Sequence, residues 1–137
     1  MIILDSDVIS ALMRPTPHTP VVSWLDLQPR SSVWTTTINV FEIRFGLQSM
    51  PRGKRQLMLI ENFNALLEKL EHRVAAFDLA AADLASELMA ARKQKGRTVG
   101  IRDTMIAGIA LAHHATLATR NASDFADTRV PLVNPWS

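Results

Sequence analysis

Short apolar runs alternate with longer segments of helical periodicity along this chain. Residues 1–4 are all apolar, which is typical of a strand that is buried on both faces. Residues 32–36 are rich in β-branched and aromatic side chains and predict a second strand. Three more strands are predicted, the last of them at a sheet edge because it contains a proline, at residues 73–78, 115–119 and 130–133.

The segments between these strands predict helices. Thr37 or Asn39 is the expected cap of the third helix, and Pro15, Pro17 and Pro20 predict an extended connection between the first two. Alternating strands and helices predict an α/β fold with a mostly parallel sheet of four to five strands, covered on both faces, and a single domain over residues 1–137. Apolar periodicity and breaking residues place the helices at about residues 8–13, 21–25, 38–49, 54–70, 79–94 and 103–113.

Composition narrows the cellular setting of the protein. The 137 residues carry a net charge of +2, and 47% of them are hydrophobic, which is ordinary for a globular domain. No apolar run is long enough to span a membrane, and Asp5 interrupts the N-terminal run too early for a signal peptide. Because the chain has no cysteine, disulfides, thiolate ligands and a cysteine nucleophile are excluded. We therefore expect a cytoplasmic protein without a membrane partner.

Basic side chains gather in two stretches that contain no acidic residue. Each stretch alone is typical of solvent-exposed helix ends and loops. Together they would attract a polyanion such as a nucleic acid toward a nearby acidic site. The first stretch comprises Arg92, Lys93, Lys95, Arg97 and Arg102, and the second comprises Arg44, Arg52, Lys54 and Arg55.

Four acidic residues occupy positions where an α/β fold gathers its ligands. Asp5 and Asp124 follow predicted strands and Asp103 opens a helix, so these three are expected at the carboxyl edge of the sheet. Glu42 lies in the helix after the second strand, close to Ile38 on the helical wheel, and we expect that helix to be largely buried. A carboxylate near apolar surface is costly unless it is paired, protonated or bound to a metal.

Each of these acids also has a structural interpretation. Asp5 can cap the following helix, although Ser6 or Asp7 can serve as the cap and leave Asp5 free for another role. Glu42 can pair with an arginine from elsewhere in the chain, and Asp103 can stabilise the first turn of its helix. The segment that ends at Asp124 is equally typical of a turn. The combination of four carboxylates is more specific than any single one.

Carboxylates gathered in one pocket raise one another's pKa, and a hard cation relieves their repulsion. Mg²⁺ prefers oxygen ligands and is commonly held by one or two carboxylates and several waters, and it can activate a water and neutralise phosphate charge. The sequence contains no nucleophile-elbow motif and no Gly-rich phosphate loop. Metal-dependent phosphodiester chemistry is therefore the favoured function. The histidines lack metal-ligand spacing; they are His18, His72, His113 and His114.

The motifs around these acids resemble those of PIN-domain proteins in their order and spacing. The resemblance covers essentially the whole chain. Trp24-Leu25 and the ending Val133-Asn134-Pro135-Trp136 are similar to the VapC-like plasmid-stability branch, which includes FitB-type proteins. The motifs are Leu4-Asp5-Ser6-Asp7, Glu42 within Val40–Gly46, Asp103 within Arg102–Ala107, Thr119-Arg120-Asn121 and Asp124-Phe125.

The resemblance implies a three-layer α/β/α fold and a Mg²⁺- or Mn²⁺-dependent endoribonuclease that acts as the toxin of a type II toxin–antitoxin pair. Such toxins usually form homodimers, and a small antitoxin that also binds operator DNA holds them inactive in a larger complex. Carried onto this chain, Asp5 and Asp103 are the expected metal ligands and Glu42 completes the acidic site. Thr119 would orient the carboxylates by hydrogen bonding.

Two positions depart from the family pattern. Many relatives carry the fourth acid at the position of Asn121, whereas here Asp124 follows three residues later. We expect Asp124 to take over the acidic role, because a negative charge helps a second cation more than an amide does. The opposite assignment keeps Asn121 as a neutral ligand or orienter. Asp7 stands where asparagine is common and adds a carboxylate near the expected metal.

Two other functions compete with this one. A non-catalytic PIN-like module would act only through antitoxin pairing and operator occupancy, although Asp5, Glu42 and Asp103 together favour catalysis. A different metal-dependent phosphoryl-transfer enzyme would act on DNA or on small phosphates. If the protein is a toxin, we expect a basic antitoxin side chain to block the acidic pocket, bound in a groove near the prolines and Trp24-Leu25.

Overall fold

The computed structural model describes residues 1–97 and 100–137. Its centre is a five-stranded sheet in the order β3-β2-β1-β4-β5, in which every pair of neighbours is parallel. The predicted α/β class and parallel sheet are therefore confirmed, and β5 lies at an edge, as predicted from Pro131, which immediately precedes this strand. The strands are β1 (Ile2–Leu4), β2 (Val33–Thr36), β3 (Val74–Ala75), β4 (Thr116–Ala118) and β5 (Leu132–Val133).

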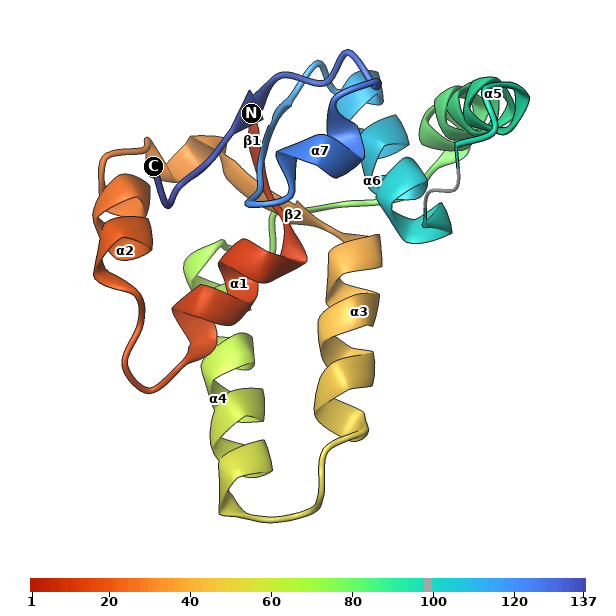
Figure 1. Ribbon diagram of the computed structural model, residues 1–137. Helices are drawn as coiled ribbons and strands as arrows, with labels where there is room; N and C mark the ends of the chain where they lie inside the picture. The colour runs from red at the N-terminus through yellow and green to blue at the C-terminus, as the bar shows by residue number, and fades with distance from the viewer. Residues whose placement is uncertain (98–99) are drawn as a thin grey trace.

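Helices cover both faces of the sheet and produce three layers (Figure 1). Neighbouring residues of β1 serve opposite cores, because strand side chains alternate: Leu4 packs toward one helical layer and Ile3 toward the other. The first layer contains α1 (Ser6–Met13), α2 (Thr19–Asp26), α3 (Thr37–Gln48) and α4 (Lys54–Lys69). The second contains α5 (Leu79–Gln94), α6 (Ile101–Ala112) and α7 (Ala122–Phe125). A short 3-10 helix, Arg30–Ser32, precedes β2.

The strand order determines where a ligand would bind. The chain moves outward from β1 through β2 to β3, whereas β4 and β5 lie on the other side of β1. The crevice at the carboxyl ends of β1 and β4 is therefore the topological switch point, the usual ligand site of an open parallel sheet. Asp5 follows β1 directly, and Thr119 follows β4 directly. In the described part of the chain, no helix combines the length and apolarity needed to cross a membrane.

Several element boundaries differ from the sequence prediction. α2 begins at Thr19 and contains Pro20, because the first turn of a helix does not need the missing proline N–H. β3 is shorter than predicted, since Asp78 caps α5 by accepting a hydrogen bond from the Ala81 amide at 3.0 Å. Thr36, the last residue of β2, caps α3 in place of Thr37 or Asn39. The segment around Asp124 forms the short helix α7.

The prediction that α3 is largely buried is wrong. Its buried stripe consists of Asn39, Ile43 and Leu47, while Phe41 and Phe45 are 56% and 61% exposed. The reason is that α3 and α4 extend together away from the sheet, so only one side of α3 has a packing partner (Figure 1).

Candidate active site

Asp5 is the most constrained carboxylate at the switch point. It is 5% exposed and stands between β1 and α1. Its Oδ1 accepts hydrogen bonds from the Ser6 amide (2.8 Å) and from Asn39 Nδ2 (3.1 Å), and its Oδ2 accepts one from Thr119 Oγ1 (2.8 Å). Of the alternatives that the sequence left open, Asp5 itself is the cap of α1, and neither Ser6 nor Asp7 replaces it. The Oδ1 atom of Asp5 caps α1, and its Oδ2 atom accepts a hydrogen bond at the end of β4. One side chain therefore caps the helix and takes part in the site.

The electrostatic environment of Asp5 disfavours its charged form. Burial raises the pKa of Asp5 from 3.8 to about 6, and the charges of Asp7 and Asp103 act in the same direction. Hydrogen bonds from Thr119 and Ser6 lower this pKa and offset part of the shift. A cation beside Asp5 would remove the cause of the remaining shift.

Thr119 and Asp7 organise the β4 side of the crevice. The Thr119 hydroxyl donates to Asp5 and accepts a hydrogen bond from the Asn121 amide at 3.0 Å. A hydroxyl has one proton, and the Asp5 distance of 2.8 Å favours that acceptor over Asp7 Oδ2 at 3.5 Å. Asp7 Oδ2 instead accepts from the Arg120 amide at 2.9 Å. These contacts are the ones through which Thr119 would orient the Asp5 carboxylate, as the family resemblance predicts.

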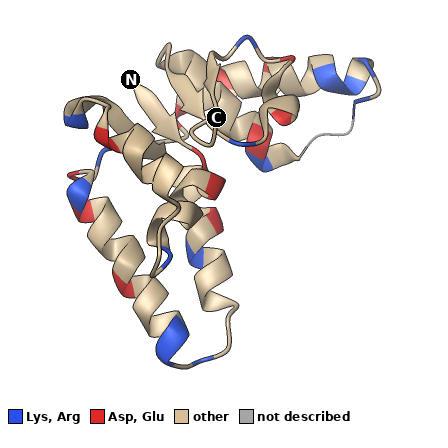
Figure 2. Cartoon of the chain, turned by 60° about the vertical axis from the view of Figure 1, so that its left-hand side comes forward, with Lys and Arg blue, Asp and Glu red and all other residues tan. Residues whose placement is uncertain are grey.

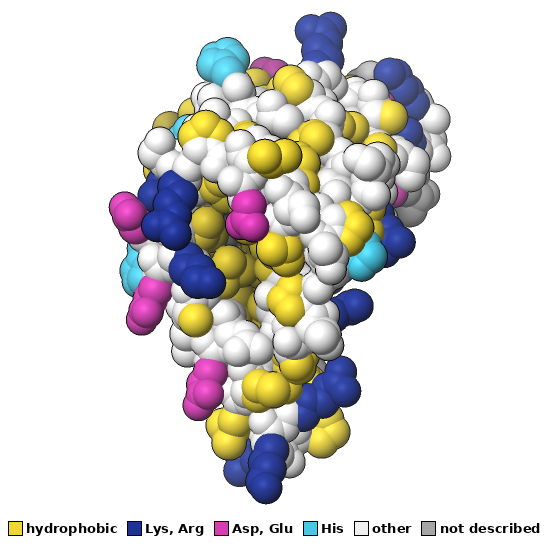
Figure 3. Space-filling model, turned by 90° about the vertical axis from the view of Figure 1, so that its left-hand side faces the viewer, with side chains coloured by type: hydrophobic (Ala, Val, Ile, Leu, Met, Phe, Trp, Pro, Cys, Tyr) yellow, Lys and Arg dark blue, Asp and Glu magenta, His cyan; other side chains and the backbone are white. Residues whose placement is uncertain are grey.

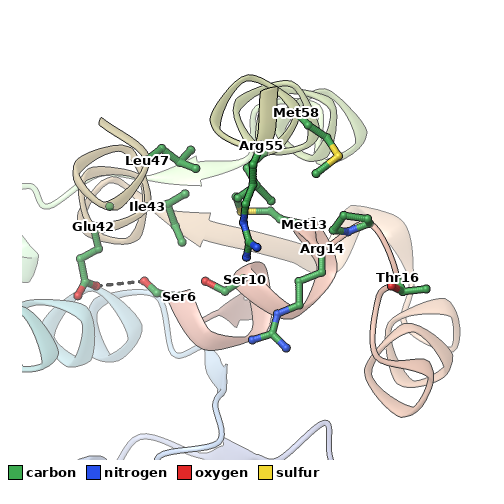
Figure 4. Close-up of a pocket in the computed structure, with 13 residues that line it drawn as sticks. Ser6, Ser10, Met13, Arg14, Thr16, Glu42, Ile43, Leu47, Arg55 and Met58 are labelled. Carbon is green, nitrogen blue, oxygen red and sulfur yellow. Dashed lines mark hydrogen bonds between the residues drawn. The ribbon is translucent and has the colours of Figure 1, made fainter. Parts of the chain in front are cut away.

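Glu42 approaches the site from α3. Its Oε1 accepts a hydrogen bond from Ser6 Oγ at 3.1 Å (Figure 4), and its Oε2 lies 3.8 Å from Arg102 Nε. The arginine partner that the sequence left open therefore exists, but half of the Arg102 side chain is exposed, and such an ion pair is weak. The charge of Glu42 still raises the pKa of Asp103, so Arg102 does not cancel it.

Asp103 brings the first turn of α6 into the same cluster. Burial raises its pKa first, followed by the charges of Asp124 and Glu42, while Arg92 and Arg102 lower it. Asp124 therefore acts electrostatically on Asp103 from its place in α7. The Asn121 side chain is exposed and makes no capping bond to α7. This arrangement favours Asp124 over Asn121 as the fourth member of the site.

Asn39 is a site residue that the sequence motifs did not indicate. Its side chain is fully buried, and its Nδ2 donates to Asp5 Oδ1 and to Ser6 Oγ (2.9 Å). Its Oδ1 accepts a hydrogen bond from Thr36 Oγ1 at 2.6 Å. Asn39 thereby connects the end of β2 to Asp5. The available signal was an amide in the otherwise apolar stripe of α3, because a buried polar group must find partners.

The prediction that the first basic stretch attracts a polyanion is wrong for Arg92. It is 1% exposed and forms an ion pair with Asp127 at 2.8 Å, so it is not available to attract a polyanion. Arg97 donates to the Ser123 carbonyl at 2.6 Å, and Lys93 remains exposed. Thr98 and Val99, inside this stretch, lie outside the described residues. In the second stretch, Arg44 stacks over the Phe63 ring at 4.7 Å and joins α3 to α4.

The chemistry of the donor set fits a hard divalent cation. Within residues 1–97 and 100–137, no three His, Cys, Asp or Glu side chains come together closely enough to enclose a metal. Mg²⁺ commonly takes only one or two carboxylates and fills its remaining positions with water. Asp5 and Asp103 suit this number of carboxylate ligands, because the pKa of each is raised and a nearby cation would favour both charged forms. Figure 2 shows acidic segments near the middle of the molecule and Lys and Arg mostly toward its outer parts.

A cavity of about 770 Å³ begins at the acidic site and continues between α1, α3 and α4 (Figure 4). Ser6 and Glu42 line its inner end, and Arg55 extends from α4 toward α1. Its apolar lining includes Met13, Ile43, Leu47, Met58 and Leu59.

The groove predicted near Trp24-Leu25 is a separate cavity. Leu25 and Pro17 line a space of about 340 Å³ that no acid of the candidate site borders. Figure 3 shows hydrophobic side chains in a hollow on the face that carries α2 and α4. The Leu25 side of the predicted groove therefore does not reach the acidic site, whereas Pro15 and Thr16 of the proline-rich stretch line the larger cavity, which does.

The sequence matches the PIN domain family over residues 2–130. The chain belongs to the PIN-domain family. This PIN domain is 39% identical to the VapC ribonuclease Y4jK of Sinorhizobium fredii, over 99% of this chain and 98% of that protein. It is 34% identical to the toxin FitB of Neisseria gonorrhoeae, over 99% of each chain. The solved structure of FitAB bound to an IR36 DNA fragment has a TM-score of 0.90 and 33% identity, covering 100% of this chain and 96% of that one. The family predicted from the motifs is therefore confirmed.

Proposed function

We propose that this PIN domain is a Mg²⁺- or Mn²⁺-dependent endoribonuclease and the toxin of a type II toxin–antitoxin pair. The observation that carries the proposal is the cluster of poorly compensated carboxylates at the switch point, where the pKa values of Asp5 and Asp103 are both raised. The full-length likeness to a VapC ribonuclease and to the toxin FitB supports the same reaction and role.

Asp5 and Asp103 would hold the cation. Bound there, it would neutralise charge on the scissile phosphate and lower the pKa of a coordinated water. The Asp5 carboxylate is already fixed by hydrogen bonds from Ser6, Asn39 and Thr119, so it needs little reorganisation to act. Glu42, held by Ser6 Oγ, would position the attacking water or take its proton from the α3 side.

The RNA backbone would meet exposed basic side chains around the site. Arg102 lies beside Glu42, and the Arg120 amide is bonded to Asp7, so both belong to the rim of the acidic crevice. Arg14 and Arg55 line the adjoining cavity. Phosphate groups near these cations would gain attraction that falls as salt is added.

The expected regulator is a small antitoxin with its own DNA-binding domain, through which alone the toxin would reach operator DNA. The cavity between α1, α3 and α4 suits a partner segment with apolar side chains. At its inner end, an arginine of that segment would satisfy two carboxylate oxygens at once and compete with the cation.

The deciding experiment compares RNA with DNA as substrate for the purified protein. We expect cleavage of RNA with Mg²⁺ or Mn²⁺, no cleavage with a chelator, and loss of cleavage in Asp5→Asn. Asp83→Asn, on the exposed side of α5, is the matched control and should behave as wild type. Cleavage of DNA or of small phosphates alone would favour a different phosphoryl-transfer enzyme. Absence of any cleavage, with a stable antitoxin complex, would favour a non-catalytic module.

A second experiment tests how the antitoxin acts. Co-expression with the product of the neighbouring gene should yield a stable complex that does not cleave RNA and that restores growth. Replacement of the antitoxin's inserted arginine by alanine should keep the complex and restore cleavage. A bound partner that leaves cleavage unchanged would refute blocking of the acidic pocket, while the nuclease assignment would stand.

A further inference from the structure

Arg92, near the end of α5, is a buried arginine whose partners come from two other elements and the loop beyond them. Its Nε and Nη2 donate to the two carboxylate oxygens of Asp127, at 2.9 and 2.8 Å. Its Nη1 donates to Thr104 Oγ1 on α6 at 2.9 Å. Its Nη2 also donates to the main-chain carbonyl of Asp124 on α7 at 2.7 Å. We call these four groups the Arg92 clamp.

Close packing of α5 on α6 delivers Arg92 to this place. A Cβ at Gly108 would lie 2.6 Å from the Ala81 carbonyl and 2.8 Å from the Ala85 side chain, so glycine is required for the approach. At about 100° per residue, Ala81, Ala85 and Arg92 share one face of α5. The guanidinium therefore arrives at the first turn of α6, where the acidic site lies.

Arg92 forms hydrogen bonds beside two site acids but none to their carboxylate oxygens. Thr104 is the residue after Asp103, and the carbonyl that Arg92 binds belongs to Asp124 itself. The positive charge of Arg92 is matched mainly by Asp127, whose pKa is lowered by these hydrogen bonds. Within the described chain Arg92 makes no ion pair with Asp103 or Asp124. It bonds the main-chain carbonyl of Asp124 and the side chain of Thr104, which is next to Asp103.

A second arginine reinforces the same segment. Arg97 donates to the carbonyl of Ser123, the residue before Asp124, and its guanidinium lies 3.8 Å from Asp127. α7 has only four residues, so its own hydrogen bonds cannot hold it firmly. The position of Asp124 therefore depends on contacts from outside the helix.

We propose that Arg92 is a positioning residue that sets the placement of Asp103 relative to Asp124, and thereby the affinity of the acidic site for a divalent cation. This inference rests on the proposed function and deepens it, because the placement of Asp103 relative to Asp124 affects cation binding only if both acids serve one metal site. Partners of this kind, one step removed from the ligands, commonly change metal affinity or activity by 10- to 100-fold when removed.

The test uses Thr104→Val, which removes the hydroxyl and keeps the shape, and Thr104→Ser, which keeps the hydroxyl. Arg92→Lys keeps the charge and loses the two-pronged geometry. Lys93→Gln, on the exposed side of the same helix, is the control. Mn²⁺ affinity is measured by electron paramagnetic resonance of free Mn²⁺, alongside kcat, KM and the melting temperature.

We expect Thr104→Val and Arg92→Lys to weaken Mn²⁺ binding and to lower kcat at saturating Mn²⁺, each by about tenfold or more. KM for RNA should change less than twofold. Thr104→Ser and Lys93→Gln should match wild type in all three quantities. Because Arg92→Lys perturbs a buried group, Thr104→Val decides the question if Arg92→Lys does not fold.

The same variants separate a positioning role for Arg92 from a purely structural one. If Thr104→Val lowers the melting temperature but keeps wild-type Mn²⁺ affinity and kcat, the clamp is only structural and the positioning role is overturned. That result would leave the nuclease assignment intact, because wild type still binds Mn²⁺ and cleaves RNA. If wild type does neither, the proposed function fails, and the positioning role fails with it.

Discussion

Two clusters of charged side chains in this molecule behave in opposite ways. At the switch point, burial and neighbouring carboxylates raise the pKa of both Asp5 and Asp103. Beside α5, the two hydrogen bonds from Arg92 hold the pKa of Asp127 below its usual value. Both clusters connect separate elements of the fold, and each contains one buried charged residue, Asp5 in the first and Arg92 in the second.

The difference lies in where the counter-charge comes from. Arg92 of the same chain supplies the counter-charge of Asp127, so this ion pair forms when the protein folds. Asp5 and Asp103 meet mainly other acids, so folding brings together charges that repel each other. Such an arrangement costs stability and is typical of a site whose counter-charge arrives with a ligand.

Asp103→Asn should reduce RNA cleavage by about 10³-fold, which corresponds to roughly 4 kcal/mol of lost transition-state stabilisation. The charge that would hold the cation disappears while the shape of the side chain is kept. Single-turnover cleavage at saturating Mn²⁺ measures the loss, with Asp83→Asn as the control. Because the repulsion also falls, the metal-free melting temperature should not decrease. Retained cleavage in Asp103→Asn would remove this residue from the metal site.

Asp127→Asn should have the opposite character and lower the stability of the fold by about 3 kcal/mol, since it leaves Arg92 buried without its partner. Urea unfolding in chelator measures the effect. The double change Arg92→Met with Asp127→Leu should recover much of the loss, because a buried ion pair and an apolar pair are often similar in stability. If Asp5→Asn destabilises the metal-free protein as much as Asp127→Asn does, the contrast between the clusters is wrong.

Asp124→Asn should reduce cleavage by about 10²-fold, and Asn121→Ala should cost less than tenfold. The reason is that the charge of Asp124 acts on Asp103, whereas the exposed Asn121 side chain contributes no cap to α7. Cleavage rates of both variants across a Mn²⁺ titration make the comparison. A larger loss in Asn121→Ala at saturating metal would reverse the assignment of the fourth site residue.

As pH rises from about 4 to about 6, the free energy of unfolding of the metal-free protein should decrease. The folded pKa of Asp5 is about 6 and its ordinary value is 3.8, so only the unfolded chain releases this proton in that window. Rising pH therefore favours unfolding there, by on the order of 2 kcal/mol, and the effect levels off above pH 6. Asp127, with a lowered pKa, contributes stability that is lost as pH falls below its ordinary value.

The pH prediction is checked by urea unfolding in chelator at pH 4, 5, 6 and 7. The difference between wild type and Asp5→Asn isolates the contribution of Asp5, because other titrating groups are common to both proteins. Asp5→Asn should lack the fall that wild type shows. Parallel curves for the two proteins would show that Asp5 is not the source of the effect.

Much of the fold was readable from local pattern. The apolar run before Asp5 predicted β1, and the β-branched run before α3 predicted β2. Pro131, just before β5, predicted the edge position of that strand. Motif spacing predicted the PIN family and selected Asp5, Glu42, Asp103 and Asp124 as site candidates. Predicted boundaries were wrong where a residue assigned to a strand instead caps a helix, as Asp78 does for α5. Local sequence does not show which of these two conformations is more stable.

Residue types and their periodicity were enough to locate the charged residues and the apolar segments, and hence to predict the layers, the sheet and the family. Which charged side chains meet depends on the packing of the folded chain. Arg92 reads as one more exposed cation in a basic stretch, yet it is buried against Asp127, 35 residues away. Asp5 is held by Thr119 across 114 residues. Periodicity reports the burial of a segment, whereas the partner of a charge depends on distances through space that only packing defines.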